Sequence, residues 1–181
     1  PQSIPNTWAK DTAAQVEAII ETAPPAASFT FGCLTQDQVA RLKAANVFVI
    51  GTATTVAEAK TWVAAGADAI CAQGIEAGGH RGTFLADMHA SAIGTMSLVR
   101  TIREAVEIPV IAAGGISDGE AVAAALMLGA DAVQIGTAYM LAEEAITPEP
   151  QREAIRNAPD DPTRLTRVYS GRHARGLDTE F

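Results

Sequence analysis

Short apolar runs alternate with longer amphipathic segments along most of the chain. The runs are nearly continuous in Val, Ile and Ala, which is typical of parallel strands that are covered on both faces. Their length excludes an independent helix in most cases. The predicted strands are Ala26–Phe31, Val47–Gly51, Ala67–Ala72, Pro109–Ala113 and Ala132–Gly136.

Between these runs, apolar residues recur at the helical period, which predicts a crossover helix after each strand. A further helix precedes the first strand. The pattern is therefore repeated βα units, and the fold class is α/β with a parallel sheet. The predicted helices are Thr12–Thr22, Gln36–Ala45, Val56–Ala65, Ser91–Val106 and Asp118–Leu128.

Several junctions carry turn or cap signals. Gly66 and Gly129 each follow a predicted helix and precede Ala-Asp-Ala, so we expect both to end their helices in the left-handed conformation. Ser117 and Glu120 have the spacing of a capping box. Beyond Tyr139 the pattern is lost, and only residues 151–156 are predicted to be helical in an otherwise irregular tail.

The composition restricts the partners and the compartment. With 181 residues, 48% of them hydrophobic, the chain can bury a sizeable core and is expected to form part or all of one domain. A net charge of -8 disfavours nucleic acid and anionic membranes, since only Arg167, Arg172 and Arg175 form a basic cluster. Cys33 and Cys71 show no disulfide or metal spacing, and no apolar run could span a bilayer, so we expect a cytoplasmic protein.

Residues 73–82 place one imidazole, His80, in a loop with four glycines directly after a predicted strand. Glycine allows a ligand to approach the backbone closely, and imidazole titrates near neutrality. The loop is therefore either part of a site or a flexible turn with an incidental histidine.

Two further strand ends are rich in glycine, at residues 113–117 and 134–138. In a TIM barrel the loops after the last two strands commonly bind phosphate through backbone N–H groups. Tight packing between strand and turn is the alternative for either loop alone. Their occurrence together, in this order, favours a phosphate site.

Residues 73–82 (QGIEAGGHRG), 112–119 (AAGGISDG) and 134–137 (QIGT) together resemble the nitronate monooxygenase (2-nitropropane dioxygenase) family. Residues 170–177 also resemble its closing S-G-R-x-A-R-G segment, with His173 where many members have proline. The resemblance implies a TIM (β/α)8 barrel that binds FMN. It places the five strands as the last five of eight, so residues 1–181 would be the carboxyl-terminal portion of one domain.

Carried over by motif, the resemblance also assigns site residues. His80 would be catalytic, as the base that deprotonates a carbon beside a nitro group or as a residue that holds the nitronate anion. The implied FMN contacts are Gln73, Gly78, Gly79, Gly114, Gly115, Gln134, Ile135, Gly136 and Thr137.

The remaining candidates are weighed individually. Arg81 would either steer an anionic substrate or form a surface ion pair, and Glu76 would anchor its loop through backbone N–H groups. His89 has no partner at metal-ligand spacing, so we expect no metal site. Packing is predicted for Trp8, Trp62, Met127 and Met140, and an inert thiol for Cys71.

The resemblance implies an FMN-dependent monooxygenase that converts alkyl nitronates or nitroalkanes and O2 to carbonyl compounds and nitrite. The related flavin enoyl-(acyl carrier protein) reductases, which use NAD(P)H, share the loops and are the alternative. A non-catalytic flavin-binding or phosphate-binding fragment is a third interpretation. The expected partners are small molecules, and the composition permits a homodimer without requiring one.

Overall fold

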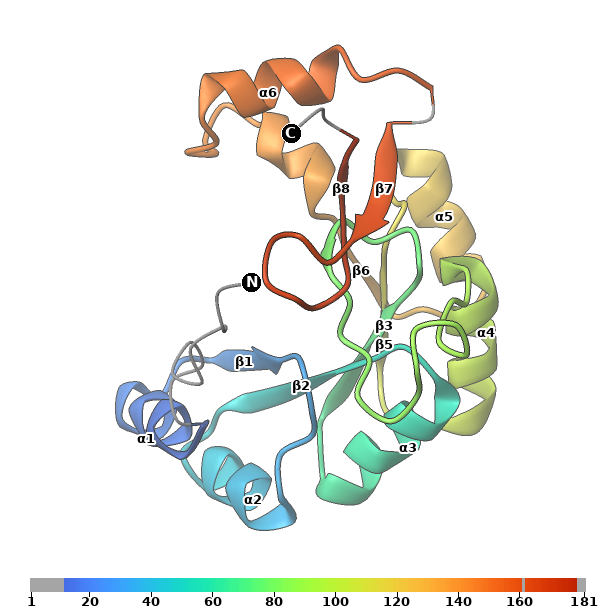
Figure 1. The fold of residues 1–181 in the computed structure, drawn as a ribbon. Coiled ribbons are helices and arrows are strands. Elements are labelled where there is room, and N and C mark those ends of the chain that lie inside the picture. The colour runs from blue at the N-terminus through green and yellow to red at the C-terminus, as the bar shows by residue number, and fades with distance from the viewer. Residues whose placement is uncertain (1–11, 161, 179–181) are drawn as a thin grey trace.

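A five-stranded parallel sheet forms the centre of the molecule in the computed structural model, which describes residues 12–160 and 162–178 (Figure 1). The spatial order β1-β2-β3-β5-β6 follows the chain, and every neighbouring pair is parallel. This arrangement confirms the predicted succession of βα units from a TIM barrel. The strands are β1 (Ala26–Phe29), β2 (Phe48–Ala53), β3 (Ala69–Gln73), β5 (Val110–Ala113) and β6 (Ala132–Gln134).

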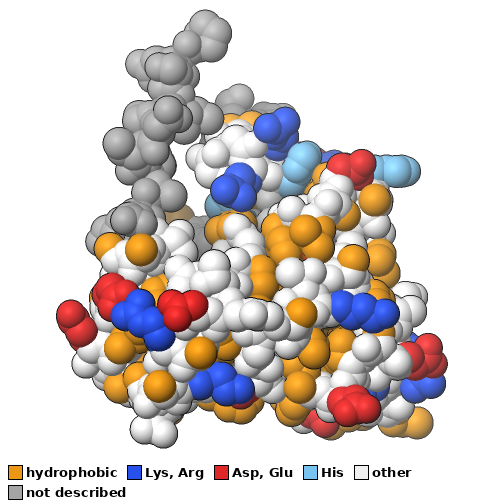
Figure 2. Space-filling model, turned by 90° about the horizontal axis from the view of Figure 1, so that it is seen from below, with side chains coloured by type: hydrophobic (Ala, Val, Ile, Leu, Met, Phe, Trp, Pro, Cys, Tyr) orange, Lys and Arg blue, Asp and Glu red, His pale blue; other side chains and the backbone are white. Residues whose placement is uncertain are grey.

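The first five helices lie along the outer side of the sheet, whereas the last helix lies beyond the end of the sheet (Figure 1). The helices are α1 (Thr12–Thr22), α2 (Gln36–Ala44), α3 (Val56–Ala65), α4 (Thr95–Ala105), α5 (Gly119–Met127), the 3-10 helix η1 (Thr137–Leu141) and α6 (Glu149–Arg156). None of those helices is both long and apolar enough to cross a bilayer. On the face seen in Figure 2, Lys and Arg side chains are interspersed with Asp and Glu.

Two helix starts differ from the prediction. Helix α4 begins at Thr95 rather than Ser91, because the backbone at residues 91–93 is used by the preceding loop, with the Ile93 carbonyl accepting from the Ile75 N–H. Helix α5 is capped by Asp118, whose carboxylate accepts from the Ala121 N–H at 2.8 Å, so the predicted Ser117 capping box is wrong. Asp118 is one residue closer to the helix and provides the stronger acceptor.

The predicted left-handed glycines are confirmed. Gly66 has φ 97° at the end of α3, and Gly129 has φ 103° just beyond α5. A residue with a Cβ would be strained at either position. Both glycines therefore allow the chain to reverse directly from a helix into the next strand.

A second sheet, which the sequence did not predict, contains the His80 segment. The two-residue strand β4 (Gly79–His80) pairs antiparallel with β8 (Ala174–Leu177), which pairs with β7 (Thr163–Thr166). The tail beyond Tyr139 is therefore less irregular than expected, although α6 confirms its helical piece. Strands β7 and β8 do not alternate apolar and polar residues, so they carry no visible strand pattern. They are held together by antiparallel backbone pairing.

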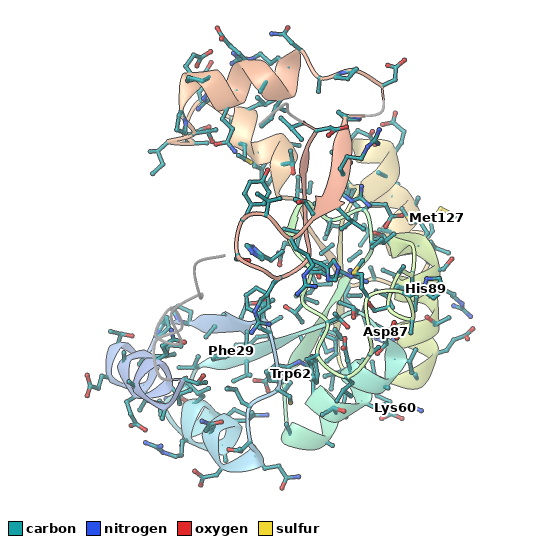
Figure 3. The ribbon with its side chains drawn as sticks, in the orientation of Figure 1. Phe29, Lys60, Trp62, Asp87, His89 and Met127 are labelled. Atoms are coloured by element: carbon teal, nitrogen blue, oxygen red, sulfur yellow. The ribbon has the colours of Figure 1, made fainter. Side chains whose placement is uncertain are left out.

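The core lies between the sheet and its helices. Trp62 is fully buried beneath the sheet, and its indole N–H donates to the Thr52 carbonyl at 3.1 Å, which confirms its packing role (Figure 3). Met127, in contrast, is 89% exposed because it ends α5 on the outer side, so its predicted packing is wrong. Met140 is half-buried, and Trp8 lies outside the described residues.

The contact between Gly51 and Trp62 should be sensitive to a single methyl group. A Cβ added at Gly51 would fall within the buried indole ring. We expect Gly51→Ala to lower the free energy of unfolding by about 3 kcal/mol, as overpacking of a rigid core does. Urea titration measures the change. Gly119→Ala, where a Cβ meets nothing within 4 Å, is the matched control and should change stability by less than about 1 kcal/mol. A neutral Gly51→Ala would contradict this account of the core.

Candidate active site

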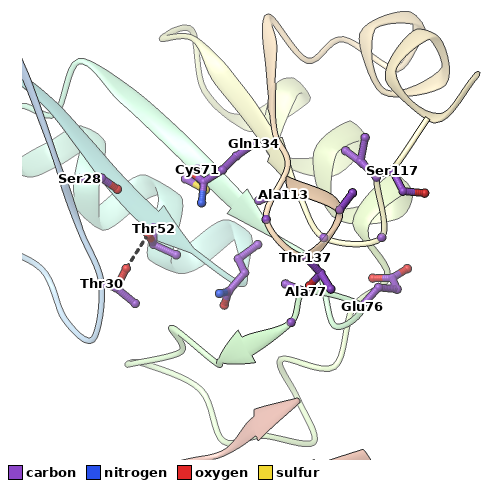
Figure 4. Close-up of a pocket in the computed structure, with 17 residues that line it drawn as sticks. Ser28, Thr30, Thr52, Cys71, Glu76, Ala77, Ala113, Ser117, Gln134 and Thr137 are labelled. Carbon is purple, nitrogen blue, oxygen red and sulfur yellow. Dashed lines mark hydrogen bonds between the residues drawn. The ribbon is translucent and has the colours of Figure 1, made fainter. Parts of the chain in front are cut away.

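A cavity of about 300 Å³ opens at the carboxyl ends of the parallel strands (Figure 4). Residues on β1, β2, β3, β5 and β6, or just after them, contribute to its wall. The predicted cofactor residues that line it are Gln73, Gly78, Gly114, Gly115, Gln134, Gly136 and Thr137. Gly79 lies in β4 instead, and the Ile135 side chain packs against the core. His80 does not line the cavity either, but it belongs to the loop at its rim.

The glycine pair after β5 is required by a close approach of two loops. Gly114 and Gly115 have φ 114° and 69°. A Cβ at Gly114 would lie 2.8 Å from the Ala77 backbone nitrogen, and one at Gly115 would lie 3.1 Å from the Glu76 Cβ. The His80 loop can therefore pack on this turn only because both positions lack a side chain.

Several backbone N–H groups at the cavity are free to bind a ligand. Within residues 12–160 and 162–178, the N–H groups of Gly115, Gly136, Thr137 and Ala138 donate no hydrogen bond. Gly115, Gly136 and Thr137 are exposed at the cavity, so their N–H groups are accessible to solvent or a ligand. A Cβ at Gly136 would meet nothing within 4 Å, so open space adjoins this loop. Free N–H donors on two loops of one cavity suit a phosphate or another anion.

Glu76 connects the His80 loop to α4 and to the glycine turn. Its carboxylate accepts from the Thr95 N–H at 2.9 Å, and the Thr95 hydroxyl lies 2.9 Å from the same oxygen and 2.8 Å from the Gly114 carbonyl oxygen. Gly94 provides no side-chain cap, so Glu76 caps the helix in its place. The expectation that Glu76 anchors the loop through a backbone N–H is confirmed.

Arg81 has neither of its predicted roles. Its side chain is buried, with 6% of the residue exposed, and it donates to the carbonyl oxygens of Gln73, Gly74 and Ser91. Burial lowers the pKa of the Arg81 guanidinium, although nearby Glu58 and Glu76 oppose that shift. It can neither reach an external anion nor form a surface ion pair. Sequence could not reveal this role, because the loop folds back around the side chain.

Gln73 joins the cavity wall to the His80 loop. Its amide donates to the His80 carbonyl at 3.0 Å and accepts from the Gly82 N–H at 2.8 Å. Gly82 is also pressed against β1 and β2, since a Cβ there would lie 2.9 Å from the Thr52 methyl and 3.1 Å from the Thr30 methyl. The backbone that carries His80 is thus held on both sides.

The imidazole of His80 contacts two residues that no sequence prediction included. Its Nε2 lies 2.5 Å from the Ser170 hydroxyl oxygen, and its ring meets the Phe31 ring edge-on at 5.8 Å. Within the described part of the chain, Nδ1 has no hydrogen-bond partner. Ser170 lies in the S-G-R segment that the family resemblance includes, whereas Phe31 was predicted only as the last residue of the first strand, which in the structure ends at Phe29.

Comparison with known proteins agrees with this geometry. The family model described as nitronate monooxygenase matches residues 3–181. The chain belongs to the nitronate monooxygenase family. A probable nitronate monooxygenase of Staphylococcus aureus (strain Newman) is 48% identical over 167 residues, which cover 92% of this chain and 47% of that relative. The chain therefore spans about half the length of the curated relatives it matches.

Solved structures of similar proteins share the fold. A nitroalkane oxidase from Streptomyces ansochromogenes superposes with a TM-score of 0.87 at 44% identity, covering 92% of this chain and 49% of that one. FabK from Thermotoga maritima superposes with a TM-score of 0.80 at 34% identity, covering 94% and 52%. Both comparisons support the same barrel architecture for this member of the nitronate monooxygenase family.

Glu58 is a buried carboxylate that the sequence did not single out. It accepts from the N–H and hydroxyl of Thr54, both at 2.7 Å, and from the N–H groups of Phe84 at 2.6 Å and Leu85 at 2.9 Å. The Thr83 hydroxyl is a fifth donor, at 3.1 Å. Burial alone would raise the pKa of Glu58, but these hydrogen bonds outweigh it and lower the pKa. Glu58 thus fixes the segment that follows His80 to the start of α3.

Cys71 adjoins the cavity without being reactive. Its thiol is buried and lies 3.6 Å from the Gln134 amide oxygen, and burial raises its pKa to about 11. The thiol is therefore protonated at neutral pH, which is consistent with the predicted inert role.

Replacing Glu58 should show how much its hydrogen bonds contribute. All five groups that contact the carboxylate are hydrogen-bond donors, and Glu58→Gln would place an amide NH2, itself a donor, among them. We expect the free energy of unfolding at pH 7 to fall by about 3 kcal/mol. Because the folded-state pKa is lowered, this stabilisation is present above the unfolded pKa of about 4.3 and is lost as pH falls through the folded pKa.

Urea unfolding of wild type and variant at pH 7 and at successively lower pH measures both effects. The difference in the free energy of unfolding between wild type and Glu58→Gln should become smaller as the pH is lowered. Glu104→Gln, in an exposed pair with Arg100, is the control and should cost less than about 1 kcal/mol. A difference that does not depend on pH would contradict the role of the Glu58 charge.

Proposed function

We propose that this protein is an FMN-dependent nitronate monooxygenase that uses O2 to convert alkyl nitronates to carbonyl compounds and nitrite. The observation that carries the proposal is an imidazole at the rim of a cavity whose wall presents free backbone N–H groups. The imidazole suits proton transfer from carbon, and the backbone N–H groups suit a phosphorylated cofactor. The similarity to a nitroalkane oxidase at 44% identity supports the combination.

The residues present fit a flavin phosphate. Gly114, Gly115, Gly136 and Thr137 would hold the phosphate through backbone donors, as the two loops do in other TIM barrels. The volume of about 300 Å³ lies at the lower end of the range for small-molecule sites. When bound, FMN supplies the transfer of electrons from the nitronate to O2.

His80 would serve as the base for neutral nitroalkanes. In the tautomer whose Nε2–H donates to Ser170, the lone pair is on Nδ1, the ring nitrogen without a partner among the described residues. Nδ1 would take the proton from the carbon beside the nitro group, and the electron pair of that C–H bond would move into the nitronate. Overall, two nitronate ions and one O2 give two carbonyl compounds and two nitrite ions, which balances atoms and charge.

Replacing His80 tests the proton transfer. We expect His80→Asn to slow turnover of a neutral nitroalkane by about 10²-fold, and to affect a preformed nitronate much less, because no C–H bond then needs a base. Oxygen uptake and nitrite release with each substrate measure the effect. His89→Asn, at an exposed position, is the matched control. Equal losses on both substrates would exclude the role as base, and NADH oxidation with an enoyl thioester would instead favour the reductase.

Filling the proposed phosphate loop tests cofactor binding separately from activity. A side chain added at Gly136 enters open space, so Gly136→Leu should leave stability nearly unchanged yet weaken FMN binding by about 10-fold or more. Flavin fluorescence quenching gives the dissociation constant, and urea unfolding of the apoprotein gives the stability. Gly119→Leu adds the same group at an open position outside the cavity and should bind FMN normally. Unchanged affinity in Gly136→Leu would place the phosphate elsewhere.

A further inference from the structure

Phe31 occupies a backbone conformation that its side chain makes unfavourable. Its φ is 74°, in the left-handed region that bulky residues rarely enter. The ring is 43% exposed, so burial in the core does not account for the conformation. Strain of this kind is commonly retained at functional sites, where the neighbouring structure holds it. The functional group whose position depends on Phe31 should therefore lie close to the Phe31 ring.

The Phe31 ring contacts both a cation and the imidazole. The guanidinium carbon of Arg172 lies 4.7 Å from the ring centroid, and the His80 ring meets the same ring edge-on at 5.8 Å. The backbone N–H of Arg172 also donates to the Ser170 hydroxyl oxygen at 3.4 Å, and this hydroxyl is the group that contacts His80 Nε2. Two loops distant in sequence thus bring a guanidinium and the proposed base into contact with the same phenyl ring.

Arg172 differs from the other members of the basic cluster in having unused donors. Arg167 donates to the Gly171 carbonyl at 2.7 Å, and Arg175 donates to the Ile75 carbonyl at 3.0 Å. For residues 12–160 and 162–178, the structure gives the Arg172 guanidinium no carboxylate and no hydrogen-bond acceptor, only the face of Phe31. Stacking restricts the orientation of the guanidinium but leaves its N–H edge available.

We propose that Arg172, oriented by Phe31, binds the two oxygens of the substrate's nitro or nitronate group beside His80. This inference rests on the proposed function and names a residue that selects for the anion. A planar guanidinium matches a planar pair of oxygens through two parallel hydrogen bonds. Its charge favours the nitronate over the neutral nitroalkane, so it would aid both capture of the anion and its formation. Arg81 cannot do this, because it is buried in its own loop.

Steady-state kinetics of the full-length FMN-loaded enzyme test the proposal. In Arg172→Gln we expect the KM for a nitronate to rise by about 10-fold or more, with a smaller change in kcat and an unaltered flavin spectrum. Arg172→Lys keeps the charge but loses the planar fork, so it should recover part of the affinity. Arg100→Gln is the control, since Arg100 pairs with Glu104 on the outer helix α4. An unchanged KM in Arg172→Gln would overturn the proposal.

Binding of nitrate, a planar oxyanion, provides a readout that does not require turnover. Its dissociation constant is measured from the perturbation of flavin absorbance in wild type and Arg172→Gln. Weaker binding in the variant by about 10-fold supports the anion site even if the wild-type enzyme oxidises no nitronate, in which case only the proposed function fails. Equal affinity in the two proteins, or no binding in either, overturns the anion site.

Discussion

The buried guanidinium of Arg81 is the interaction on which the arrangement of the candidate site depends. It joins the end of β3, at Gln73 and Gly74, to Ser91 at the far end of the same loop. A buried charge costs several kcal/mol unless hydrogen bonds and opposite charges compensate for it, so the carbonyls cannot easily be exchanged for other partners. Glu58 and Glu76 supply the opposite charges and fix the middle of the loop and its contact with α4. The position of His80 follows from these three residues together.

The glycines of the site have two distinct functions. Gly114, Gly115 and Gly82 lie where a Cβ would meet neighbouring atoms at 2.8 to 3.1 Å, so they allow the His80 loop to pack on the ends of the strands. Gly136 has open space around it and leaves its N–H group accessible. Packing and binding thus make different demands on the same residue type. The first set brings the rim of the cavity close to its wall, and the second leaves room for a ligand.

The elements that follow from local pattern were predicted well, and those that depend on distant contacts were not. The βα succession and the left-handed glycines Gly66 and Gly129 follow from residues close in sequence. The pairing of β4 with β8 and the contact between His80 and Ser170 join segments about 90 residues apart, and neither has an apolar pattern. The burial of Arg81 was missed for a related reason. A charged side chain is expected at the surface unless the fold supplies partners, and those partners are carbonyl groups that every residue carries.

The net charge of the chain implies that the proposed anionic substrate would have to be bound by short-range groups. A net charge of -8 gives a field that repels anions, although salt screens it beyond about 8 Å at physiological ionic strength. Attraction must therefore come from donors that contact the ligand directly. The free N–H groups of Gly115 and Gly136, at the cavity, and the guanidinium of Arg172, over the Phe31 ring, are donors of this kind. In the proposed function, these separate donors would hold the cofactor phosphate and the substrate anion, so that the two negative charges do not share the same donors.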